Sequence, residues 1–264
     1  MSESPSIRWH KAIPIRHSRR RYDARKLASD MAGLLQRLCV EFRPFPEARA
    51  VFVESPADDV FKGALGSYGK VKGAPSYIAF IGRMDSPFVH ERVGYTGEGI
   101  ILEATLQGLG TCWIGGYFHP EVAARAVSLD KTEKVLAVTP VGYALRATAL
   151  EEKVLKGLVR SHHRLPLASL VTGLDPDRWP PWVRAALEAA RLAPSAVNRQ
   201  PWRFTVDEHS ITVSVGSEKN TGHIDKRLDC GIAMLHIELG ALSEGAKGVW
   251  EFLPPPPVAR YRLI

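Results

Sequence analysis

The sequence predicts an α+β protein with two pseudo-symmetric halves, each packing a central mixed sheet against helices. Two observations lead to this class. Apolar residues at helical spacing alternate along the chain with short runs rich in β-branched residues. The whole pattern then begins again after Pro176 and the Pro180-Pro181 pair. We therefore expect a first half over residues 13–170 and a shorter second half over 176–264, folded together as one compact domain.

The composition is that of a globular protein and excludes several other classes. Of the 264 residues, 45% are hydrophobic and 24% are charged, which argues against wholesale disorder. The net charge of +7 favours anionic partners, but the basic residues are scattered apart from 16–25 and form no nucleic-acid-binding module. We expect neither a nucleic-acid nor a membrane partner, because no apolar run approaches the roughly 18 residues of a spanning helix and no signal peptide is recognisable. The three widely spaced cysteines indicate reduced thiols and a cytoplasmic protein.

The first half opens with a loose lead-in, a basic run and an amphipathic helix. This helix is expected over residues 27–39, where leucines and one methionine share a face. A strand-like segment, 50–53, comes next. It is followed by a Gly-rich loop, 63–73, whose glycines lack the order of a phosphate-binding P-loop.

A second helix is expected over residues 97–110, and it is apolar enough to be buried. Its small residues Ala104 and Gly108, four positions apart, would allow another helix to approach closely. The turn 111–118 contains two adjacent glycines that make it flexible. The β-branched run 135–143 is then expected to form a central strand.

The second half repeats this order in fewer residues. Its long helix is headed by residues 229–231, which align with residues 97–99 of the first half. A hairpin is expected because two alternating runs flank the polar residues 207–210. The expected elements are a helix over 182–192, a corner over 193–202, strands over 204–206 and 211–215, a helix over 231–240, and strands over 249–252 and 260–264.

The corner 193–202 is the most informative stretch of the chain. Pro194 ends the preceding helix, and Ser195, Asn198 and Gln200 are short polar side chains that donate and accept hydrogen bonds. On these grounds alone the segment is a self-satisfied turn. Its pattern Pro-Ser-x-x-Asn-x-Gln-Pro-Trp, however, resembles a motif of the flavin-dependent nitroreductase family, whose Ser and Asn touch FMN across the interface of a homodimer. The resemblance assigns FMN contacts to Pro194, Ser195, Asn198 and Gln200.

The basic run at residues 16–21 carries a second motif. Guanidinium groups make paired, charge-assisted bonds to phosphate oxygens, and a serine hydroxyl adds another bond. A solvated helix end is the simpler interpretation of so short a run. The run resembles the Arg-[Arg/His]-Ser-x-[Arg/Lys] motif with which nitroreductases hold the FMN phosphate and ribityl chain. The resemblance assigns this role to Arg16, His17, Ser18 and Arg20.

The resemblance also points to parts of the first half that would face the flavin ring. The turn at Gly115 and Gly116 corresponds to backbone beside the reactive N5 of the flavin, where it leaves the ring open to a substrate. Lys70 is assigned to the pyrimidine edge, and a solvated lysine fits the sequence equally well.

The segment 162–167 resembles the basic carboxy-terminal tail of single-unit nitroreductases. There, basic residues complete the phosphate site, which suggests Arg164, with Arg160 as the alternative. His162 and His163 lack a third ligand at suitable spacing, so we expect surface histidines and no metal site.

The two halves complement each other. The first keeps the basic run and the glycine turn but has no Asn-bearing corner, and the second keeps the corner but has no basic run. In the family homodimer, each FMN site takes residues from both subunits. The chain therefore resembles a fused, internally duplicated nitroreductase, a monomer that acts as an internal pseudo-dimer with one composite site.

This resemblance implies an FMN-dependent oxidoreductase. Electrons would pass from NADH or NADPH to the flavin, and then to a nitroaromatic, a quinone or another flat, electron-poor small molecule, by a ping-pong cycle. No catalytic protein side chain is expected, because the flavin carries the chemistry. A non-catalytic flavin- or small-ligand-binding protein with a degenerate nitroreductase fold is the alternative.

Overall fold

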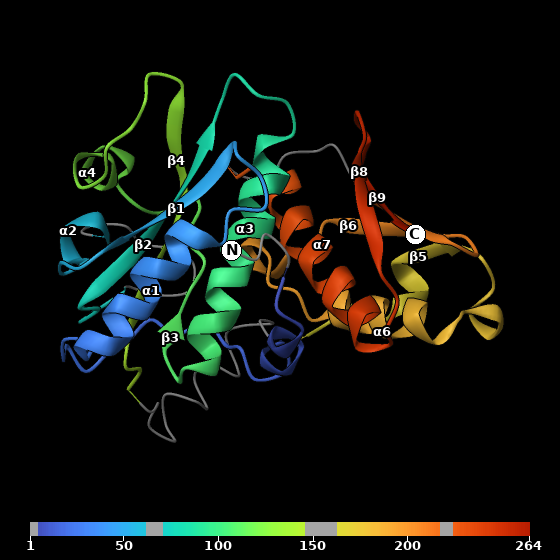
Figure 1. Ribbon diagram of the computed structural model, residues 1–264, viewed down its shortest axis with the longest axis horizontal. Helices are drawn as coiled ribbons and strands as arrows, with labels where there is room; N and C mark the ends of the chain where they lie inside the picture. The colour runs from blue at the N-terminus through green and yellow to red at the C-terminus, as the bar shows by residue number, and fades with distance from the viewer. Residues whose placement is uncertain (1–4, 62–70, 146–162, 217–223) are drawn as a thin grey trace.

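Two β-sheets lie on either side of a pair of long helices, α3 (Val89–Leu106) and α7 (Lys226–Ser243) (Figure 1). The structure is a computed structural model, and it describes residues 5–61, 71–145, 163–216 and 224–264. The chain up to residue 145 builds one sheet and its helices, and the chain from residue 163 builds the other. Within the described ranges, every helix falls short of the length and apolar character that a bilayer-spanning segment requires.

The first sheet has four strands in the order β1-β2-β4-β3, and all neighbours are antiparallel. Its central strand β2 is buried on both faces, because successive side chains point to opposite sides. Ile78 and Phe80 belong to the main core with α1 and α3, whereas Tyr77 and Ala79 belong to a smaller core with α2 and α4. The bounds are α1 (Ser29–Glu41), β1 (Ala48–Val53), α2 (Asp58–Phe61), β2 (Ser76–Arg83), β3 (Gly110–Thr111), α4 (Pro120–Arg125) and β4 (Glu133–Gly142).

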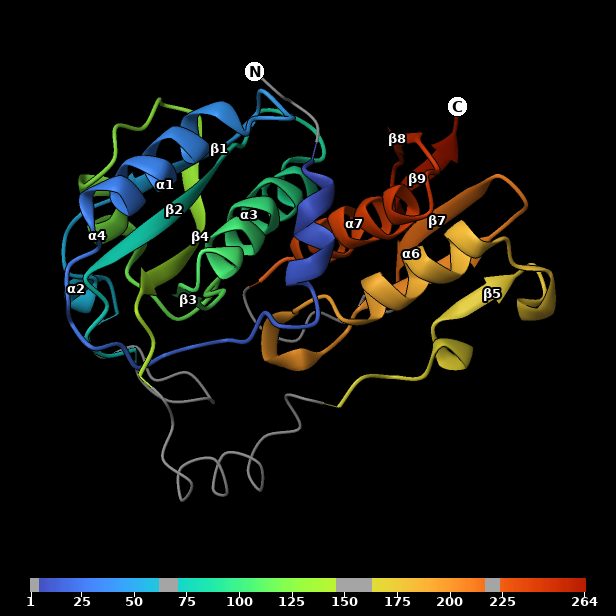
Figure 2. The same cartoon turned by 60° about the horizontal axis from the view of Figure 1, so that its bottom comes forward.

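The second sheet has five strands in the order β5-β6-β7-β9-β8. Strand β5 (Val171–Gly173) pairs in parallel with β6, and the other neighbours are antiparallel. Helix α6 packs against α7, as Figure 2 shows. The remaining bounds are α6 (Pro181–Arg191), β6 (Trp202–Val206), β7 (Ser210–Val215), β8 (Gly248–Phe252) and β9 (Pro257–Leu263).

The strand order of the first sheet recurs in the second. Without β5, the order β6-β7-β9-β8 repeats β1-β2-β4-β3, and in each half a helix precedes the first strand and a long helix follows the second. The long helices have the same length of 18 residues. Val89 to Lys226 and Leu106 to Ser243 are both steps of 137 residues, so one step relates both ends of the two helices.

The two long helices touch at a pair of glycines related by the same step. A Cβ atom on Gly94 would lie 2.1 Å from the carbonyl oxygen of Leu228, and one on Gly231 would lie 2.0 Å from that of Glu91. The expected alignment of residues 229–231 with 97–99 is therefore wrong by five residues, because Gly231 corresponds to Gly94. Backbone contact at the crossing is what requires a residue without a side chain at these two positions.

The close approach expected at Gly108 is also wrong. Gly108 lies just past the end of α3 with a φ of +75°, and no atom lies within 4 Å of where its Cβ would be. Gly245, one step of 137 residues further on, has a φ of +74° and equally open surroundings. Both glycines end their helices in the left-handed conformation that a side chain disfavours.

Most other elements lie where the sequence predicts them, with shifted ends. The helix expected over 27–39 is α1, the helix over 182–192 is α6, and the hairpin of β6 and β7 forms as expected. The two long helices begin earlier than expected, at Val89 and Lys226. The sequence pattern missed the short elements α2, α4 and β5.

A 3-10 helix at the start of the described chain, η1 (Ile7–Ala12), contacts both long helices. The indole of Trp9 donates a 2.7 Å hydrogen bond to Glu103 of α3, and Arg8 forms an ion pair with the same carboxylate. In Figure 2 this helix is the dark blue segment in front of α3 and α7. It fixes the starting point of the basic run that follows it.

Candidate functional site

The corner after α6 holds three residues in unusual backbone conformations. Val197, Asn198 and Gln200 have φ angles of +47°, +54° and +44°, which L-residues rarely adopt. For the β-branched Val197 the cost is highest. The turn is held by the amide of Gln200, which donates a 2.9 Å hydrogen bond to Oγ of Ser195. Such local strain persists only where surrounding contacts enforce it, and it gathers at ligand sites.

The side chains of Asn198 and Gln200 tie the corner to the segment before β5. Oδ1 of Asn198 accepts a 2.6 Å bond from the Arg164 guanidinium, and its Nδ2 donates to the carbonyl of His163 at 2.9 Å. The amide group of Gln200 accepts from the Leu165 amide at 2.9 Å and donates to the His163 carbonyl at 3.1 Å. Both side chains therefore have protein partners, as the turn interpretation expects.

Asp229, at the start of α7, anchors the other side of the corner. Its carboxylate accepts from the Ala196 amide at 3.1 Å and from Nε of Arg199 at 2.7 Å. The side chains of Arg199 and Asp229 are only 10% and 2% exposed. Burial raises the pKa of Asp229 to about 6, although the charge of Arg199 opposes the shift. The sequence pattern gave no sign of this anchor.

Arg16 reaches the corner from the other end of the chain. Its side chain is buried, and its Nε has no hydrogen-bond partner among the described residues. Burial lowers the pKa of Arg164 to about 10, and the positive charge of Arg16 lowers it further. The two guanidinium groups are therefore close neighbours. Two desolvated cations, one with an unsatisfied donor, form a site suited to an anion.

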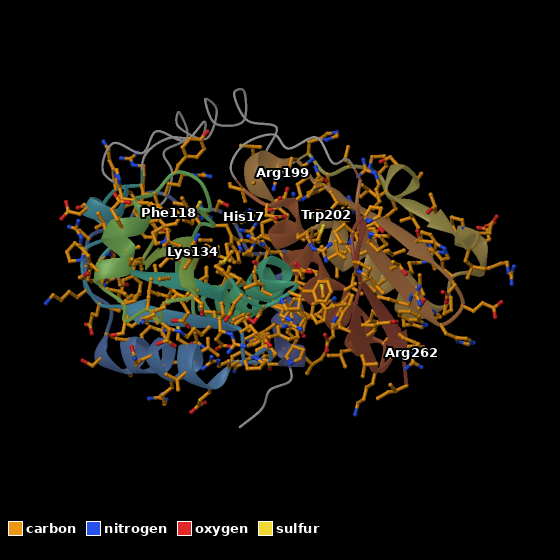
Figure 3. The ribbon with its side chains drawn as sticks, turned by 90° about the horizontal axis from the view of Figure 1, so that it is seen from above. His17, Phe118, Lys134, Arg199, Trp202 and Arg262 are labelled. Carbon is orange, nitrogen blue, oxygen red and sulfur yellow. The ribbon has the colours of Figure 1, made fainter. Side chains whose placement is uncertain are left out.

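The rest of the basic run lies along the first half. Ser18 pairs with Thr111 in a parallel bridge, so the run follows the start of the turn 111–118. His17 and Ser18 are exposed and Arg20 is half-buried. Seen from above in Figure 3, His17 lies at the junction of the halves, between Phe118 of the first and Arg199 of the second.

The turn with Gly115 and Gly116 meets the second half at Ile224. A Cβ on either glycine would lie 3.3 or 3.1 Å from the Ile224 side chain. The carbonyl of Ile224 in turn accepts a 3.0 Å bond from Arg199 of the corner. The glycine turn and the polar corner, which belong to different halves, therefore share a neighbour.

A buried carboxylate, Glu98 of α3, lies behind the glycine turn. Its Oε2 accepts a 2.6 Å hydrogen bond from the Trp113 indole, and its Oε1 lies 3.0 Å from Nε2 of His236 in α7. Neither Glu98 nor His236 is exposed at all. The sequence analysis did not single out Glu98. A charged residue inside an apolar helix is the signal that could have found it, because such groups are rarely buried without a partner.

The predicted residues thus fall into two groups. Arg16, Arg164, Asn198 and the glycine turn come together around the junction of the halves. Lys70, Arg160 and His162 lie outside the described residues. His163 is exposed, and its carbonyl, not its imidazole, serves the corner. In the described part of the chain, no three His, Cys, Asp or Glu side chains gather in a way that could hold a metal ion.

The fold and this junction define the class of protein. It has the mixed α+β, two-sheet architecture of the nitroreductases, with a basic run and a polar corner at one junction. The chain belongs to the family described as "Putative TM nitroreductase", whose model matches residues 9–241. Membership places it among oxidoreductases. No curated protein matches the chain significantly.

Solved structures agree with this fold. The chain is similar to a "putative nitroreductase" from Thermotoga maritima, with 23% identity and a TM-score of 0.64, over 100% of this chain and 95% of the other. A nitroreductase with bound FMN from Bacteroides fragilis matches with 18% identity and a TM-score of 0.42, over 55% of this chain and 95% of the other. An FMN-dependent nitroreductase from Clostridium difficile matches with 16% identity and a TM-score of 0.42, over 52% and 88%.

Proposed function

We propose that this protein is an FMN-dependent NAD(P)H oxidoreductase that reduces nitroaromatics, quinones or similar flat, electron-poor molecules. The observation that carries the proposal is the meeting of Arg16 with Arg164, which itself binds Asn198. A basic run and a polar corner far apart in sequence thereby face one place. The unpartnered Nε of Arg16 fits a phosphate group, because phosphate oxygens accept several charge-assisted bonds at once.

The residues of the chain divide the work of binding. Arg16 and Arg164 would hold the phosphate of FMN, with Ser18 and Arg20 nearby on the same run. The corner with Ser195 and Asn198 and the turn with Gly115 and Gly116 would border the ring. FMN, when bound, supplies the two-electron chemistry of a ping-pong cycle, and the protein supplies binding, orientation and electrostatics.

We infer that the chain is an internally duplicated monomer with one composite site. The repeated strand order, the shared step of 137 residues and the paired glycines at the helix crossing support this inference. One FMN per chain follows, because only one junction combines a basic run with an Asn-bearing corner. We expect a small-molecule acceptor, and no nucleic-acid or membrane partner.

One observation favours a non-catalytic flavin- or small-ligand-binding protein instead. The amide groups of Asn198 and Gln200 already have protein partners, so a ligand must compete with them or share them. Such a protein would hold the flavin without passing its electrons to an acceptor.

Titration of the apoprotein with FMN tests the proposal. We expect saturation at one FMN per chain, bleaching of the flavin absorbance by NADH or NADPH without oxygen, and its recovery on adding menadione or nitrofurazone. Binding without bleaching would favour the non-catalytic protein. A protein that takes up no FMN would contradict both.

A further inference from the structure

The buried carboxylate Glu98 occupies a central place that the flavin proposal does not use. It lies on α3 of the first half, completely buried, and its two oxygens are divided between two partners. One partner, Trp113, begins the turn that leads to Gly115 and Gly116. The other, His236, belongs to α7 of the second half.

The partners of His236 determine where its protons lie. Nδ1 faces the carbonyl oxygen of Ala189 at 2.9 Å, and a carbonyl only accepts, so Nδ1 carries a proton. Nε2 and Oε1 of Glu98, 3.0 Å apart, then share one further proton. Whether that proton rests on nitrogen or oxygen, the pair is neutral in total and every polar atom in it has a partner.

The contacts continue from this pair to the polar corner. Ala189 lies in the last turns of α6, and the carbonyl of Leu192, just past that helix, accepts a 3.1 Å bond from Arg164. Arg164 in turn donates to Asn198. The charge of Glu98 also acts on Arg164 directly, since it raises the pKa of that guanidinium against the effect of burial. Glu98 is thus linked to both sides of the candidate site.

The packing of Trp113 makes this link stiff. Its ring lies 4.6 Å from the Phe80 ring of β2, centroid to centroid. A Cβ on Gly97 would lie 2.4 Å from the indole, so α3 leaves space for the ring next to Glu98. Immediately after it, Ile114 exchanges two 2.9 Å backbone bonds with Val138 of β4. The indole therefore has one placement, and the bond to Glu98 holds it there.

We propose that Glu98 and His236 are positioning residues that set the glycine turn of one half relative to the polar corner of the other. The proposal rests on the proposed function, since the distance between these two segments matters only if one ligand lies between them. Removing the pair leaves the fold but loosens both segments.

A second buried carboxylate provides a matched control. Glu238 of α7 also accepts from a tryptophan indole, that of Trp250, at 2.8 Å, and from the Tyr95 hydroxyl at 2.7 Å. Trp250 follows Trp113 by the step of 137 residues that relates the long helices. Glu238 is thus comparable in burial and bonding, but it bonds to neither the glycine turn nor the corner.

Hydrogen exchange on the full chain without ligand tests the positioning role. The variants are Glu98→Gln, the double variant Glu98→Leu with His236→Leu, and Glu238→Leu as control. Glu98→Gln keeps an acceptor for Trp113 and a donor for His236, so its exchange should match the wild type. The double variant leaves no unpaired buried charge, so it should fold, with exchange about tenfold faster at residues 113–116 and 195–200.

Two results would overturn the proposal. One is unchanged exchange of both segments in the double variant. The other is faster exchange at the same two segments in Glu238→Leu, because the effect would then belong to any buried carboxylate. Faster exchange across the whole chain in the double variant also counts against it, since a general loss of stability is a structural role.

FMN affinity gives the second readout, by a cycle with Trp113→Phe. The double variant should bind FMN about 100-fold more weakly, and adding Trp113→Phe should weaken it no further, because Glu98 acts through the indole. Multiplying effects would refute that route. Glu98→Gln should restore affinity. If the wild-type chain takes up no FMN, the proposed function fails, and the exchange experiment still decides the positioning role.

Discussion

The two corners of the molecule occupy comparable places and carry opposite charges. Arg92 of α3 and Asp229 of α7 are related by the step of 137 residues, and each holds the corner of its own half. Arg92 pairs with Glu47 at 2.8 Å, whereas Asp229 pairs with Arg199 at 2.7 Å. A similar backbone is thus fixed by the same kind of ion pair with its polarity reversed.

What surrounds the two corners differs more than the ion pairs do. Around Arg92, aromatic rings fill the space, with Phe45 and Phe252 5.4 Å apart and the Arg92 guanidinium 4.7 Å above Phe252. Around Asp229, two glycines face Ile224, and the guanidinium groups of Arg16 and Arg164 lie nearby. The comparison teaches that the same framework supports a packed aromatic end and a polar end suited to a ligand.

The largest expected effect tests the framework that both ends share. Gly94→Ala and Gly231→Ala should each lower the free energy of unfolding by at least about 3 kcal/mol, because the added methyl meets backbone that cannot move aside. Gly108→Ala and Gly245→Ala, which meet no atoms, should cost only about 1 kcal/mol from their positive φ. Urea unfolding measures all four. Unequal effects within either pair would break the comparison.

A pH dependence should distinguish the polar corner from the aromatic one. The folded state binds the proton of Asp229 more tightly than the unfolded chain does, because burial raises its pKa to about 6 from a usual value of about 3.9. This group therefore lowers the free energy of unfolding as the pH rises from about 4 to about 6, by up to about 3 kcal/mol. Asp229→Asn should remove that slope, and Arg92→Lys should keep it. An unaltered slope in Asp229→Asn would remove Asp229 as its source.

A third prediction concerns the anion site of the polar end. Arg16→Ala should weaken FMN binding about 100-fold, or about 2.7 kcal/mol, since a charge-assisted bond to phosphate is lost. Riboflavin, which has no phosphate, should lose no more than about threefold. Isothermal titration with both flavins measures the difference. Arg19→Ala, an exposed neighbour in the same run, is the control. Equal losses for both flavins would contradict the phosphate role.

The smallest expected effect concerns the side chain of Asn198. Asn198→Ala should weaken FMN binding about tenfold, because the corner loses its tie to Arg164. Asn198→Gly should weaken binding equally but fold more stably than the alanine variant, since glycine tolerates the φ of +54°. Fluorescence titration and thermal unfolding separate the two. Retained affinity in the glycine variant would show that the side chain is not used.

Local features of the chain could be predicted from the sequence, and contacts between distant residues could not. Pro194 and the alternation after it predicted the corner, and the leucine stripe of residues 27–39 predicted α1. The long helices were predicted too short, because Gly94 and Thr96 interrupt the apolar pattern of α3 although both are buried. Gly94 is tolerated there because α7 crosses at that point.

The candidate site divides in the same way. The motifs at residues 16–20 and 193–202 are local and could be recognised from sequence. The anchor Asp229 and the pair of Glu98 with His236 could not, because the latter two are 138 residues apart in the chain. Only the packing of α3 on α7 brings them together, and no short-range pattern records that packing.

The link between the halves has a consequence for how the site behaves in solution. Strand β5 follows the first half and adds itself to the edge of the second sheet, next to β6. When two separate subunits build a site, dilution takes it apart by mass action. Here both contributors are tethered in one polypeptide, so their effective concentration does not depend on how much protein is present.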